Sequence, residues 1–328
     1  MGSGGDKAKT DVEAIMDSLG YVNIGLPQQR SKNSVKAYIV TLLSVLKGVR
    51  ELKKGDTLVL QYPLKKYYDF VVKHALGKGA RVITVLHDLG SFRRKKLTVE
   101  EEVKRLNLSD AIIIHSPAMQ QWLREHGVTT KLVQLGLWDY LSDASPASPV
   151  PSASGRPRLV FAGNVSPRAN GWLYDLASDS PDVDLILYGK GIDQTRMTPN
   201  IIAKGFVDSD TLIAGAQGEY GLVWYGTSLD EGAGPLGEYL QYNAPHKLSL
   251  YLRAGLPVII WEKAGLAPVV KELGIGITVP SLRGIGDILH QITPDQYTAM
   301  RRNVSDVAKK LASGHFVSKA LKECCNDE

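Results

Sequence analysis

The sequence predicts an α/β fold made of two domains, each a doubly wound parallel sheet, that face each other across a cleft. Two observations predict this fold. Short apolar runs alternate with amphipathic stretches along the chain, which is typical of parallel strands whose faces are both covered by helices. Residues 142–157, SDASPASPVPSASGRP, consist largely of Ser, Ala and Pro and cannot build a core, so they are predicted to link two domains.

The first predicted domain, residues 1–141, contains five apolar, β-rich runs. They lie at residues 21–26, 57–63, 81–88, 111–116 and 131–136. Stretches that predict helices lie between them, at residues 34–52, 67–77 and 117–127. The chain opens with a Gly-rich start and then a helical pattern, whereas a doubly wound domain usually opens with a strand. We therefore expect that a first strand is missing, or that this edge of the sheet is built differently.

The second predicted domain, residues 158–310, repeats the alternation. Its strands are predicted at residues 158–164, 183–189, 220–226, 257–261 and 275–279, and its helices at 208–217, 245–254, 265–273 and 294–312. Ligands of such sheets bind outside the carboxyl ends of the strands. The cleft between the two domains is therefore the expected site.

Composition narrows the class of protein. The sequence has no apolar run of about 18 residues and no signal-peptide pattern, so no membrane span is predicted. Cys324 and Cys325 are adjacent, which suits neither a disulfide framework nor a metal cluster, and a cytoplasmic protein is expected. The net charge of +5 fits nucleic acid, an anionic membrane or a phosphorylated ligand alike. Basic runs at residues 65–68 and 93–96 are either solvated surface or a patch that docks on anionic lipid.

A cationic helix start in the second domain predicts an anion site. Pro245 suits the first position of a helix, and His246 and Lys247 follow it. Cations there are repelled by the helix dipole unless an anion binds, and the free backbone N–H groups of the first turn would help to hold that anion. The alternative is a histidine that faces the core beside a lysine on the surface.

The end of the first strand of this domain is a second candidate. Gly163 and Asn164 close the strand, and Arg168 follows in a polar turn. Glycine lets a ligand approach the backbone, and the Arg168 guanidinium could bind a phosphate through two hydrogen bonds. The alternative is a plain connection between strand and helix. The sequence carries neither a dinucleotide-binding glycine fingerprint nor a P-loop at a strand end.

Carboxylates suited to proton transfer occur at two places. His87 and Asp88 stand at the carboxyl end of a central strand of the first domain, where they could form a general base or bind a hydroxyl-rich acceptor, unless Asp88 only caps the next helix. A Gly-rich loop of the second domain holds three more: Asp230, Glu231 and Glu238. No spacing resembles a zinc site and no serine stands in a nucleophile elbow, so neither a metal centre nor hydrolase chemistry is predicted.

Four stretches resemble glycosyltransferases of the GT-B architecture: FAGNVS (161–166), residues 220–267, IGITVPS (275–281) and VLHDL (85–89). More closely, they resemble bacterial β-1,6-galactofuranosyltransferases of polysaccharide assembly and the glucosyltransferases that extend sugars on serine-rich adhesins. The resemblance spans nearly the whole chain from about Asp6 and is more specific in the second domain. That family would begin with a short strand, which supports the interpretation that a first strand is missing here.

The resemblance implies two Rossmann-like domains, a C-terminal helix at residues 311–328 that returns to the N-terminal domain, and a UDP-sugar donor bound mainly by the C-terminal domain. It also implies catalysis without a metal, so cations of the protein must neutralise the leaving diphosphate. His246, Lys247 and Arg168 would meet that need. Matched onto this chain, the residues that would line the donor pocket are Gly163, Asn164, Tyr225, Thr227 and Ser249.

The resemblance also bears on stereochemistry. Retaining enzymes of this architecture often carry two Glu separated by seven residues, and Leu250 stands where the second would be. We therefore expect inversion, which needs a base that takes the proton of the acceptor hydroxyl. Asp88, beside His87, is the first candidate. The carboxylates ranked behind it are Asp230, Glu231 and Glu238.

The predicted reaction moves a galactofuranosyl or glucosyl group from UDP to a hydroxyl of a glycan on a lipid carrier or a protein. Contact of residues 93–96 with the inner face of the membrane and a homo-oligomer are further expectations. Nucleic acid is not an expected partner, because the apolar strands offer no exposed sheet with aromatic platforms. Two alternatives stay open: a non-catalytic sugar-nucleotide-binding subunit, and a sugar-nucleotide epimerase of the same shape.

Overall fold

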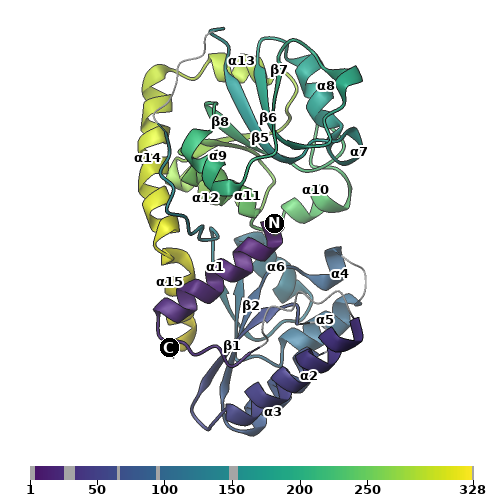
Figure 1. Cartoon of the computed structure of the whole chain (residues 1–328), viewed down its shortest axis with the longest axis vertical. Helices are drawn as coiled ribbons and strands as arrows, with labels where there is room; N and C mark the ends of the chain where they lie inside the picture. Colours follow the sequence, from purple (N-terminus) through teal and green to yellow (C-terminus); the bar gives the residue numbers. More distant parts are fainter. Residues whose placement is uncertain (1–3, 26–33, 65–66, 94–96, 148–153, 327–328) are drawn as a thin grey trace. The chain divides into compact units, whose positions relative to one another are not determined.

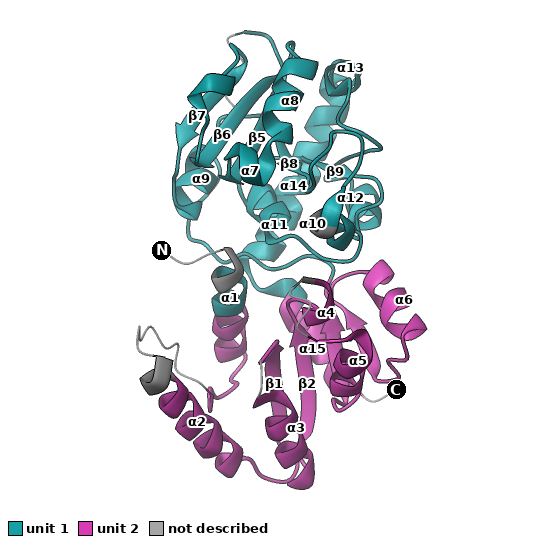
Figure 2. Ribbon diagram, turned by 90° about the vertical axis from the view of Figure 1, so that its right-hand side faces the viewer, with its two compact units in different colours: residues 1–11, 136–316 teal, residues 12–135, 317–328 magenta. Residues whose placement is uncertain are grey.

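The structure is a computed structural model that describes residues 4–25, 34–64, 67–93, 97–147 and 154–326. Contacts within the chain divide it into two compact units. Unit 1 comprises Met1–Asp11 and Gly136–Phe316, and unit 2 comprises Val12–Leu135 and Val317–Glu328 (Figure 2). Each unit contains a parallel sheet with helices packed on it, which confirms the predicted α/β fold class.

Unit 1 is built on six parallel strands in the order β10-β9-β8-β5-β6-β7 (Figure 1). The strands are β5 (Arg158–Asn164), β6 (Asp184–Lys190), β7 (Ile201–Gly205), β8 (Tyr220–Val223), β9 (Val258–Trp261) and β10 (Gly276–Val279). The chain adds strands outward from β5 in one direction and then from β8 in the other. The strand order therefore reverses between β5 and β8, and in a doubly wound sheet this switch point is where ligands bind.

The helices of unit 1 bury the central strands. They are α7 (Pro167–Asn170), α8 (Trp172–Asp179), α9 (Ser209–Gly215), α10 (Gly234–Leu240), α11 (His246–Arg253), α12 (Ala267–Leu273), α13 (Ile285–His290) and α14 (Pro294–Ala312), with a 3₁₀ turn at Gln194–Arg196. Strands β8 and β9 are buried along their whole length. This burial explains why their sequences are almost continuously apolar and why both strands could be predicted.

Helix α11 is fixed directly on the switch point by Tyr251. The Tyr251 hydroxyl accepts a hydrogen bond from the Ala162 backbone N–H of β5 at 2.8 Å. Its ring packs against Gly221 of β8, where a Cβ would come within 2.3 Å of the ring. The glycine thus lets α11 lie close to β8. Together the two contacts hold α11, and therefore its first turn, beside the ends of β5 and β8.

Unit 2 contains four parallel strands in chain order, β1 (Thr57–Tyr62), β2 (Arg81–Leu86), β3 (Ala111–Ile114) and β4 (Lys131–Gln134). Its helices are α2 (Ser34–Glu51), α3 (Tyr68–Gly77), α4 (Gly90–Arg93), α5 (Val99–Leu106) and α6 (Pro117–Glu125). Strands β2 and β3 are almost wholly buried. Among the described strands, the reversal of order occurs in unit 1 and not here.

Two helices contribute residues to both units: α1 (Gly4–Ser18) and α15 (His315–Cys325). From Val317 onward the C-terminal segment belongs to unit 2. There Arg81 donates to the carbonyl oxygen of Cys324 at 2.8 Å, and Lys131 donates to that of Asn326 at 2.7 Å. These contacts agree with the predicted return of the C-terminal helix to the N-terminal part of the chain.

The predicted strand at residues 21–26 is wrong for its described part, residues 21–25, which contains no strand. The side chain of Asn23 accepts a hydrogen bond from the Gly25 backbone N–H at 2.9 Å, and Val22 is 81% exposed. A short polar side chain that bonds its own backbone two residues on offers the chain a turn instead of strand pairing.

Two further boundaries differ from the prediction. Strand β7 was not predicted, because Ile201 alone among its five residues is buried and no apolar pattern marks it. Pro245 is the N-cap of α11 and not its first residue, since its ψ of 122° is extended. The helix therefore begins at His246.

The compact units group two segments differently from the predicted domains 1–141 and 158–310. Lys7 of α1 donates to the carbonyl oxygen of Leu141 at 2.7 Å, which ties the start of α1 to unit 1. Arg253 of α11 donates to the carbonyl oxygens of Tyr140 at 3.1 Å and of Ser142 at 2.6 Å. The start of the predicted linker is thus held to unit 1, and residues 148–153 lie outside the described residues.

Candidate functional site

The candidate site lies at the carboxyl ends of β5 and β8, at the switch point of unit 1. Strand β5 ends with the exposed residues Gly163 and Asn164, and Tyr225 follows β8. The first turn of α11 reaches the same place, because Nζ of Lys247 lies 3.2 Å from the position that a Cβ on Gly163 would occupy. The structure thus brings together Gly163, Tyr225 and Lys247, which the sequence had predicted as site residues.

Aromatic rings surround the Lys247 ammonium. Its Nζ lies 3.8 Å from the centroid of the Phe161 ring and 5.4 Å from that of Tyr225. Within the described part of the chain it makes no hydrogen bond and no ion pair. Burial lowers the pKa of Lys247 to about 7, because the charged form loses water and gains no counter-charge. An ammonium in this state is suited to bind an anion.

Helix α11 adds the partial positive charge of its N-terminus. Its N-cap, Pro245, makes no side-chain hydrogen bond, so the first N–H groups of the helix lack the side-chain acceptor that usually caps them. Lys247 is the second residue of this helix. The dipole, the uncapped N–H groups and the ammonium therefore favour the same kind of ligand, a phosphate or diphosphate.

His246 is not the second cation that the sequence predicted. Its ring stacks on Tyr140, with centroids 4.7 Å apart and planes at 29°. Burial and the charge of Lys7 lower the pKa of His246 to about 4, so the imidazole is neutral near pH 7. Its Nε2 atom is buried and has no hydrogen-bond partner among the described residues. The helix start therefore carries one cation beside a neutral, stacked ring.

Lys7 and Asp11 of α1 belong to this part of unit 1, and no sequence pattern indicated a role for them. The Lys7 ammonium lies 4.7 Å from the centroid of the Tyr140 ring and 2.8 Å from Oδ1 of Asp11. Burial raises the pKa of Asp11. These residues precede Tyr140 by well over a hundred positions, so only the folded chain could reveal that they support the ring on which His246 stacks.

Glycines keep the loop after β5 close to β6. Gly163 has a φ of 152° and Gly191 a φ of 92°, a region that side chains rarely adopt. A Cβ on Gly189 of β6 would lie 1.8 Å from the Gly163 carbonyl oxygen. The exposed Asn164 side chain bonds to its own loop, because its Oδ1 accepts from the Ser166 backbone N–H at 3.0 Å. The backbone position at Gly163 therefore depends on a glycine in the neighbouring strand.

Three other residues predicted for the donor pocket are either exposed or fully buried. Arg168 of α7 and Thr227 are exposed, and in the described chain Arg168 makes no hydrogen bond or ion pair. Ser249 is only 1% exposed on the inner face of α11, so its hydroxyl is closed to a ligand. We therefore correct Ser249 from a donor contact to a buried residue of the helix.

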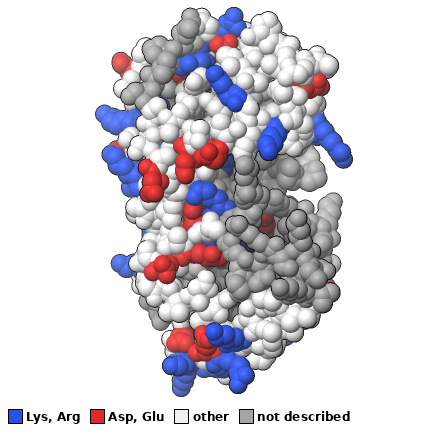
Figure 3. Space-filling view, viewed as in Figure 1, with Lys and Arg blue, Asp and Glu red and all other residues white. Residues whose placement is uncertain are grey.

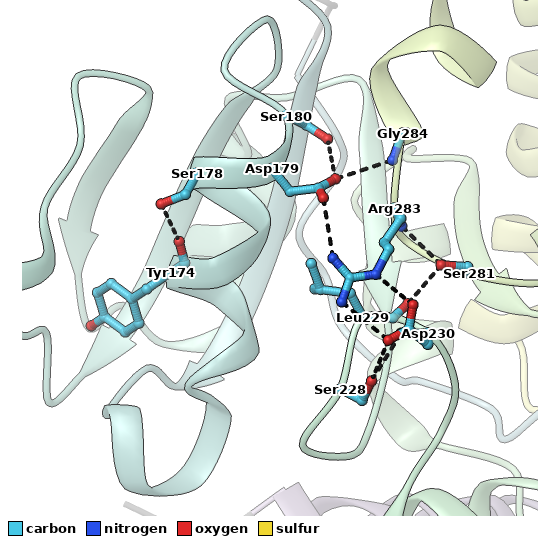
Figure 4. A network of polar contacts seen from close by, with 10 residues as sticks. All are labelled: Tyr174, Ser178, Asp179, Ser180, Ser228, Leu229, Asp230, Ser281, Arg283 and Gly284. Atoms are coloured by element: carbon cyan, nitrogen blue, oxygen red, sulfur yellow. Dashed lines mark hydrogen bonds and ion pairs between the residues drawn. The ribbon is translucent and has the colours of Figure 1, made fainter.

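Asp230 takes part in a network of polar contacts (Figure 4). Arg283 donates to both of its carboxylate oxygens, at 2.5 and 3.1 Å, and also reaches Asp179 at 3.4 Å. The hydrogen bonds from Arg283 lower the pKa of Asp230. Ser281 holds the adjacent backbone by donating to the carbonyl oxygen of Leu229 at 3.0 Å. The network ties the loop after β8 to the loop after β10, and it makes Asp230 a poor proton acceptor.

The other two acids of this loop are open to solvent. Glu231 and Glu238 are exposed, and neither side chain has a hydrogen bond or ion pair in the described part of the chain. Their place behind Asp88 among the predicted bases stays a prediction.

In unit 2, His87 and Asp88 follow β2 at its carboxyl end, as the sequence predicted. His87 Nε2 lies 2.7 Å from Oε1 of Gln61 on the neighbouring strand β1. Asp88 is half-buried and stands two residues before α4. Both predicted residues are therefore near the end of the sheet where ligands of parallel α/β proteins bind.

A buried glutamate that the sequence did not single out fixes the segment after Asp88. Glu102 of α5 is 1% exposed and accepts hydrogen bonds from the backbone N–H groups of Gly90 at 2.7 Å and Ser91 at 2.9 Å. It also accepts from the Tyr62 hydroxyl at 2.8 Å and from that of Ser91 at 2.5 Å. The acidic run at residues 100–102 is typical of a helix start. For this reason the sequence did not indicate that Glu102 also binds the backbone of the segment after Asp88.

Glu102→Gln should lower the free energy of unfolding by about 2–3 kcal/mol, because the new amide N–H groups would face donors that the carboxylate now satisfies. Urea unfolding followed by circular dichroism measures the change. Glu100→Gln, at an exposed position on the same helix, is the matched control and should cost much less stability, because the Glu100 carboxylate is exposed and makes only local hydrogen bonds. Equal stability of the two variants would contradict the capping role of Glu102.

Two kinds of feature are absent from the described residues. No group of three or more His, Cys, Asp or Glu side chains there could hold a metal ion, and no helix is long and apolar enough to cross a bilayer. The side chains of residues 93–96 and 65–66 lie outside what the structure describes. On the face drawn in Figure 3, the described Lys and Arg side chains are interspersed with Asp and Glu.

Family models match both parts of the chain. The model described as glucosyltransferase 3-like, C-terminal domain, matches residues 159–324. The model described as glucosyltransferase 3-like, N-terminal domain, matches residues 1–137. The first match includes the switch point and α11, and the second includes His87 and Asp88.

Curated relatives are similar over most of their length. The β-1,6-galactofuranosyltransferase WbbI of Escherichia coli (strain K12) is 28% identical over 328 residues, which cover 98% of this chain and 93% of the relative. Glucosyltransferase 3 of Streptococcus gordonii is 27% identical over 278 residues, covering 81% of this chain and 78% of the relative.

Solved structures share the fold at low sequence identity. Anabaena Alr3699/HepE, solved in complex with UDP, has a TM-score of 0.60 at 15% identity and covers 87% of this chain and 83% of its own. The lipopolysaccharide outer core galactosyltransferase WaaB, solved in its apo form, has a TM-score of 0.64 at 10% identity and covers 99% and 95%. At such identities the likeness concerns the fold.

Proposed function

This chain belongs to the glucosyltransferase 3-like family, and from that premise we propose that it transfers a hexosyl group from a UDP-sugar to a hydroxyl group of a glycan. The relatives named for galactofuranosyl and glucosyl transfer support this reaction class. The two alternatives, a non-catalytic binding subunit and an epimerase, are not favoured by these similarities. The transferred sugar is proposed to be galactofuranose or glucose.

One observation carries the proposal: the Lys247 ammonium at the switch point, without an acid partner in the described chain. A UDP-sugar contains a diphosphate, and the negative charge of this diphosphate increases when the bond to the sugar breaks. Lys247 and the uncapped start of α11 would hold that charge, which is stabilisation of the kind that speeds departure of a leaving group. His246 would contribute as a neutral, stacked neighbour.

The proposed reaction inverts the anomeric centre and needs no metal. The acceptor oxygen forms a bond to C1 of the sugar from the face opposite to UDP, the bond between C1 and the β-phosphate oxygen breaks, and UDP leaves with the electron pair. A base takes the acceptor proton. Lys247 and α11 supply the positive charge that a metal would otherwise bring, and this supports metal independence.

The proposed acceptor is a glycan on a lipid carrier or a protein. We place the protein in the cytoplasm, with peripheral contact to the inner face of the membrane through residues 93–96. The basic composition of that run supports this placement. A homo-oligomer remains part of the prediction from the sequence.

A panel of nucleotides tests the proposed function. UDP, UDP-glucose and UDP-galactofuranose should each raise the unfolding temperature, with and without EDTA, because a ligand that binds only the folded state stabilises it. GDP and GDP-mannose are the controls and should have little effect. Proton NMR of the product formed with a glycan acceptor gives the anomeric configuration. Absence of protection by every UDP compound would overturn the proposal.

A further inference from the structure

Two buried acceptor atoms without a partner lie at the start of α11, beside Lys247. Among the described residues of unit 1, the buried side-chain oxygens and nitrogens that lack a hydrogen bond are Nε2 of His246 and Oδ1 of Asn243. Folded proteins seldom leave such atoms unpaired, because each has lost its water and gained no partner in return. We propose that Nε2 of His246 accepts a hydrogen bond from a hydroxyl group of the bound UDP-sugar. The inference rests on the proposed function, since it names the part of the donor that this site recognises.

Tyr140 holds the imidazole ring of His246 in one orientation. The two rings stack with their centroids 4.7 Å apart and their planes at 29°. The Tyr140 backbone N–H donates to the Leu311 carbonyl oxygen at 3.0 Å, and its own carbonyl oxygen accepts from Nε of Arg253 at 3.1 Å. The Lys7 ammonium lies 4.7 Å from the centroid of the Tyr140 ring. His246 therefore stacks on a ring that is anchored within unit 1.

The surroundings of His246 determine which ring nitrogen carries the proton. The ring donates a hydrogen bond to the backbone carbonyl oxygen of Asp139. Because Nε2 has no partner among the described residues, the donor is Nδ1. Burial and the charge of Lys7 lower the pKa of His246 to about 4, so near pH 7 the ring is neutral and Nε2 carries the lone pair. In this state Nε2 can only accept a hydrogen bond.

A lone pair at Nε2 selects for a hydroxyl group and against a phosphate. The diphosphate oxygens of a UDP-sugar carry no proton near pH 7, so they too can only accept hydrogen bonds. Hydroxyl groups can donate. Oδ1 of Asn243 is likewise an acceptor, and the Lys247 ammonium beside both residues is a cation. The three groups together match a ligand in which hydroxyl groups adjoin a phosphate.

The positions of His246 and Lys247 in the helix favour one ligand that contacts both. They are the first two residues of α11, and both keep partial exposure. Consecutive residues of a helix point in directions about 100° apart, since one turn takes 3.6 residues. A bare phosphate at Lys247 would leave Nε2 of His246 unpaired, whereas a sugar joined to that phosphate supplies the additional reach. In a UDP-sugar this sugar is either the transferred hexose or the ribose.

A pair of substitutions separates the two ring nitrogens. His246→Gln places an amide oxygen near the position of Nε2, whereas His246→Asn keeps a donor near the position of Nδ1 and removes the acceptor. Calorimetric titration of the full chain with UDP-glucose and UDP-galactofuranose should show roughly 5- to 20-fold weaker binding for His246→Asn. His246→Gln should bind nearly as tightly as the parent protein. Equal losses in the two variants would contradict a role for Nε2.

Ligands that lack particular hydroxyl groups identify the source of the hydrogen bond. If His246→Asn weakens the binding of the UDP-sugar and not of UDP, the hydroxyl group belongs to the transferred hexose. If it weakens both and spares 2′,3′-dideoxy-UDP, the hydroxyl group belongs to the ribose. Equal weakening of all three ligands would indicate a phosphate contact or a general disturbance and would overturn the inference. Unchanged binding of all three would overturn it as well.

His126→Asn is the matched control. The His126 ring also stacks on an aromatic ring, with its centroid 4.1 Å from that of Trp122, and its Nδ1 donates to the Trp122 carbonyl oxygen at 2.8 Å. This histidine belongs to unit 2 and is exposed. Its substitution should leave the affinities for UDP and for the UDP-sugars unchanged. A loss as large as that of His246→Asn would show that removal of any stacked histidine weakens binding.

Nitrogen-15 NMR of labelled histidines tests the acceptor atom in the parent protein. The signals lost in His246→Gln assign His246. Near pH 7 the free ring should be protonated on Nδ1, and the Nε2 signal should move upfield when the UDP-sugar binds. Protonation of both nitrogens in the complex would indicate a phosphate contact and would overturn the inference. If the parent protein binds UDP-sugar and Nε2 does not respond, this inference alone fails, whereas absence of any UDP binding means that the proposed function fails.

Discussion

Lys247→Met should weaken UDP binding by roughly 10- to 100-fold, as expected for the loss of a hydrogen bond to a charged group. The same change should make the free protein more stable, because it removes a half-buried charge that has no counter-charge in the described chain and leaves a side chain that packs on Phe161 and Tyr225. Opposite signs for binding and stability are the signature of a residue kept for its ligand.

The same lysine predicts how both quantities depend on pH. Burial lowers its pKa from 10.5 to about 7. Between about pH 7 and 10.5 the unfolded chain therefore binds a proton that the folded chain does not, so this residue makes the free energy of unfolding rise with pH in that window. Bound diphosphate favours the charged ammonium, so UDP binding takes up a proton above pH 7 and its affinity falls as pH rises. Lys247→Met should remove both dependences.

Isothermal titration calorimetry with UDP, in two buffers of different ionisation enthalpy, measures the affinity and the proton uptake together. Urea unfolding at several pH values measures the stability. Lys204→Met is the control, since Lys204 is exposed on β7 and has no ion pair in the described chain, and it should change neither quantity. Unchanged UDP affinity in Lys247→Met would refute the phosphate site.

Gly189→Ala should lower the free energy of unfolding by about 3 kcal/mol or more and abolish UDP binding. The new Cβ would lie 1.8 Å from the Gly163 carbonyl oxygen and 3.2 Å from Cγ1 of Val165. The first of these atoms is backbone, so no change of rotamer can relieve the clash. The end of β5 must move, and with it the surface that faces Lys247.

Gly215→Ala is the control for this substitution. Gly215 ends α9 at an exposed position, and a Cβ there meets nothing within 4 Å. Alanine should be neutral or slightly stabilising at this place, because it restricts the unfolded chain more than glycine does. Thermal unfolding with and without UDP compares the two variants. If Gly189→Ala binds UDP like the control, the close approach of β6 to β5 does not position the site.

The elements that the sequence predicted well are those whose neighbours are all apolar. Strands β8 and β9 are buried throughout, and their uninterrupted runs could be recognised without knowledge of what covers them. Strand β7 lies at an edge with one buried residue and left no such pattern. Residues 21–26 have a β-rich composition. In their described part, however, Asn23 bonds to the backbone of Gly25 and the chain forms a turn instead of a strand.

The residues of the candidate site also differ in how well the sequence predicted their roles. Lys247 was predictable as a candidate residue. A cation at the start of a helix is repelled by the helix dipole, and this unfavourable placement can be recognised from the sequence alone. The neutrality of His246 was not, because it follows from stacking on Tyr140 and from the charge of Lys7, both distant in the chain. Ser249 was misplaced for a related reason: its direction on α11 is set by the packing of that helix on the sheet.

The sequence by itself determined the fold class and the place of the lysine proposed to bind phosphate, because strand burial and helix termini are properties of neighbouring residues. Only the tertiary structure decided which groups carry charge and which way they point. Lys7, Tyr140 and His246 lie far apart in the sequence, and burial together with the charge of Lys7 keeps the imidazole of His246 neutral near pH 7. Hydrogen-bond direction and desolvation depend on atoms brought together by folding, and a linear pattern of residues does not contain them.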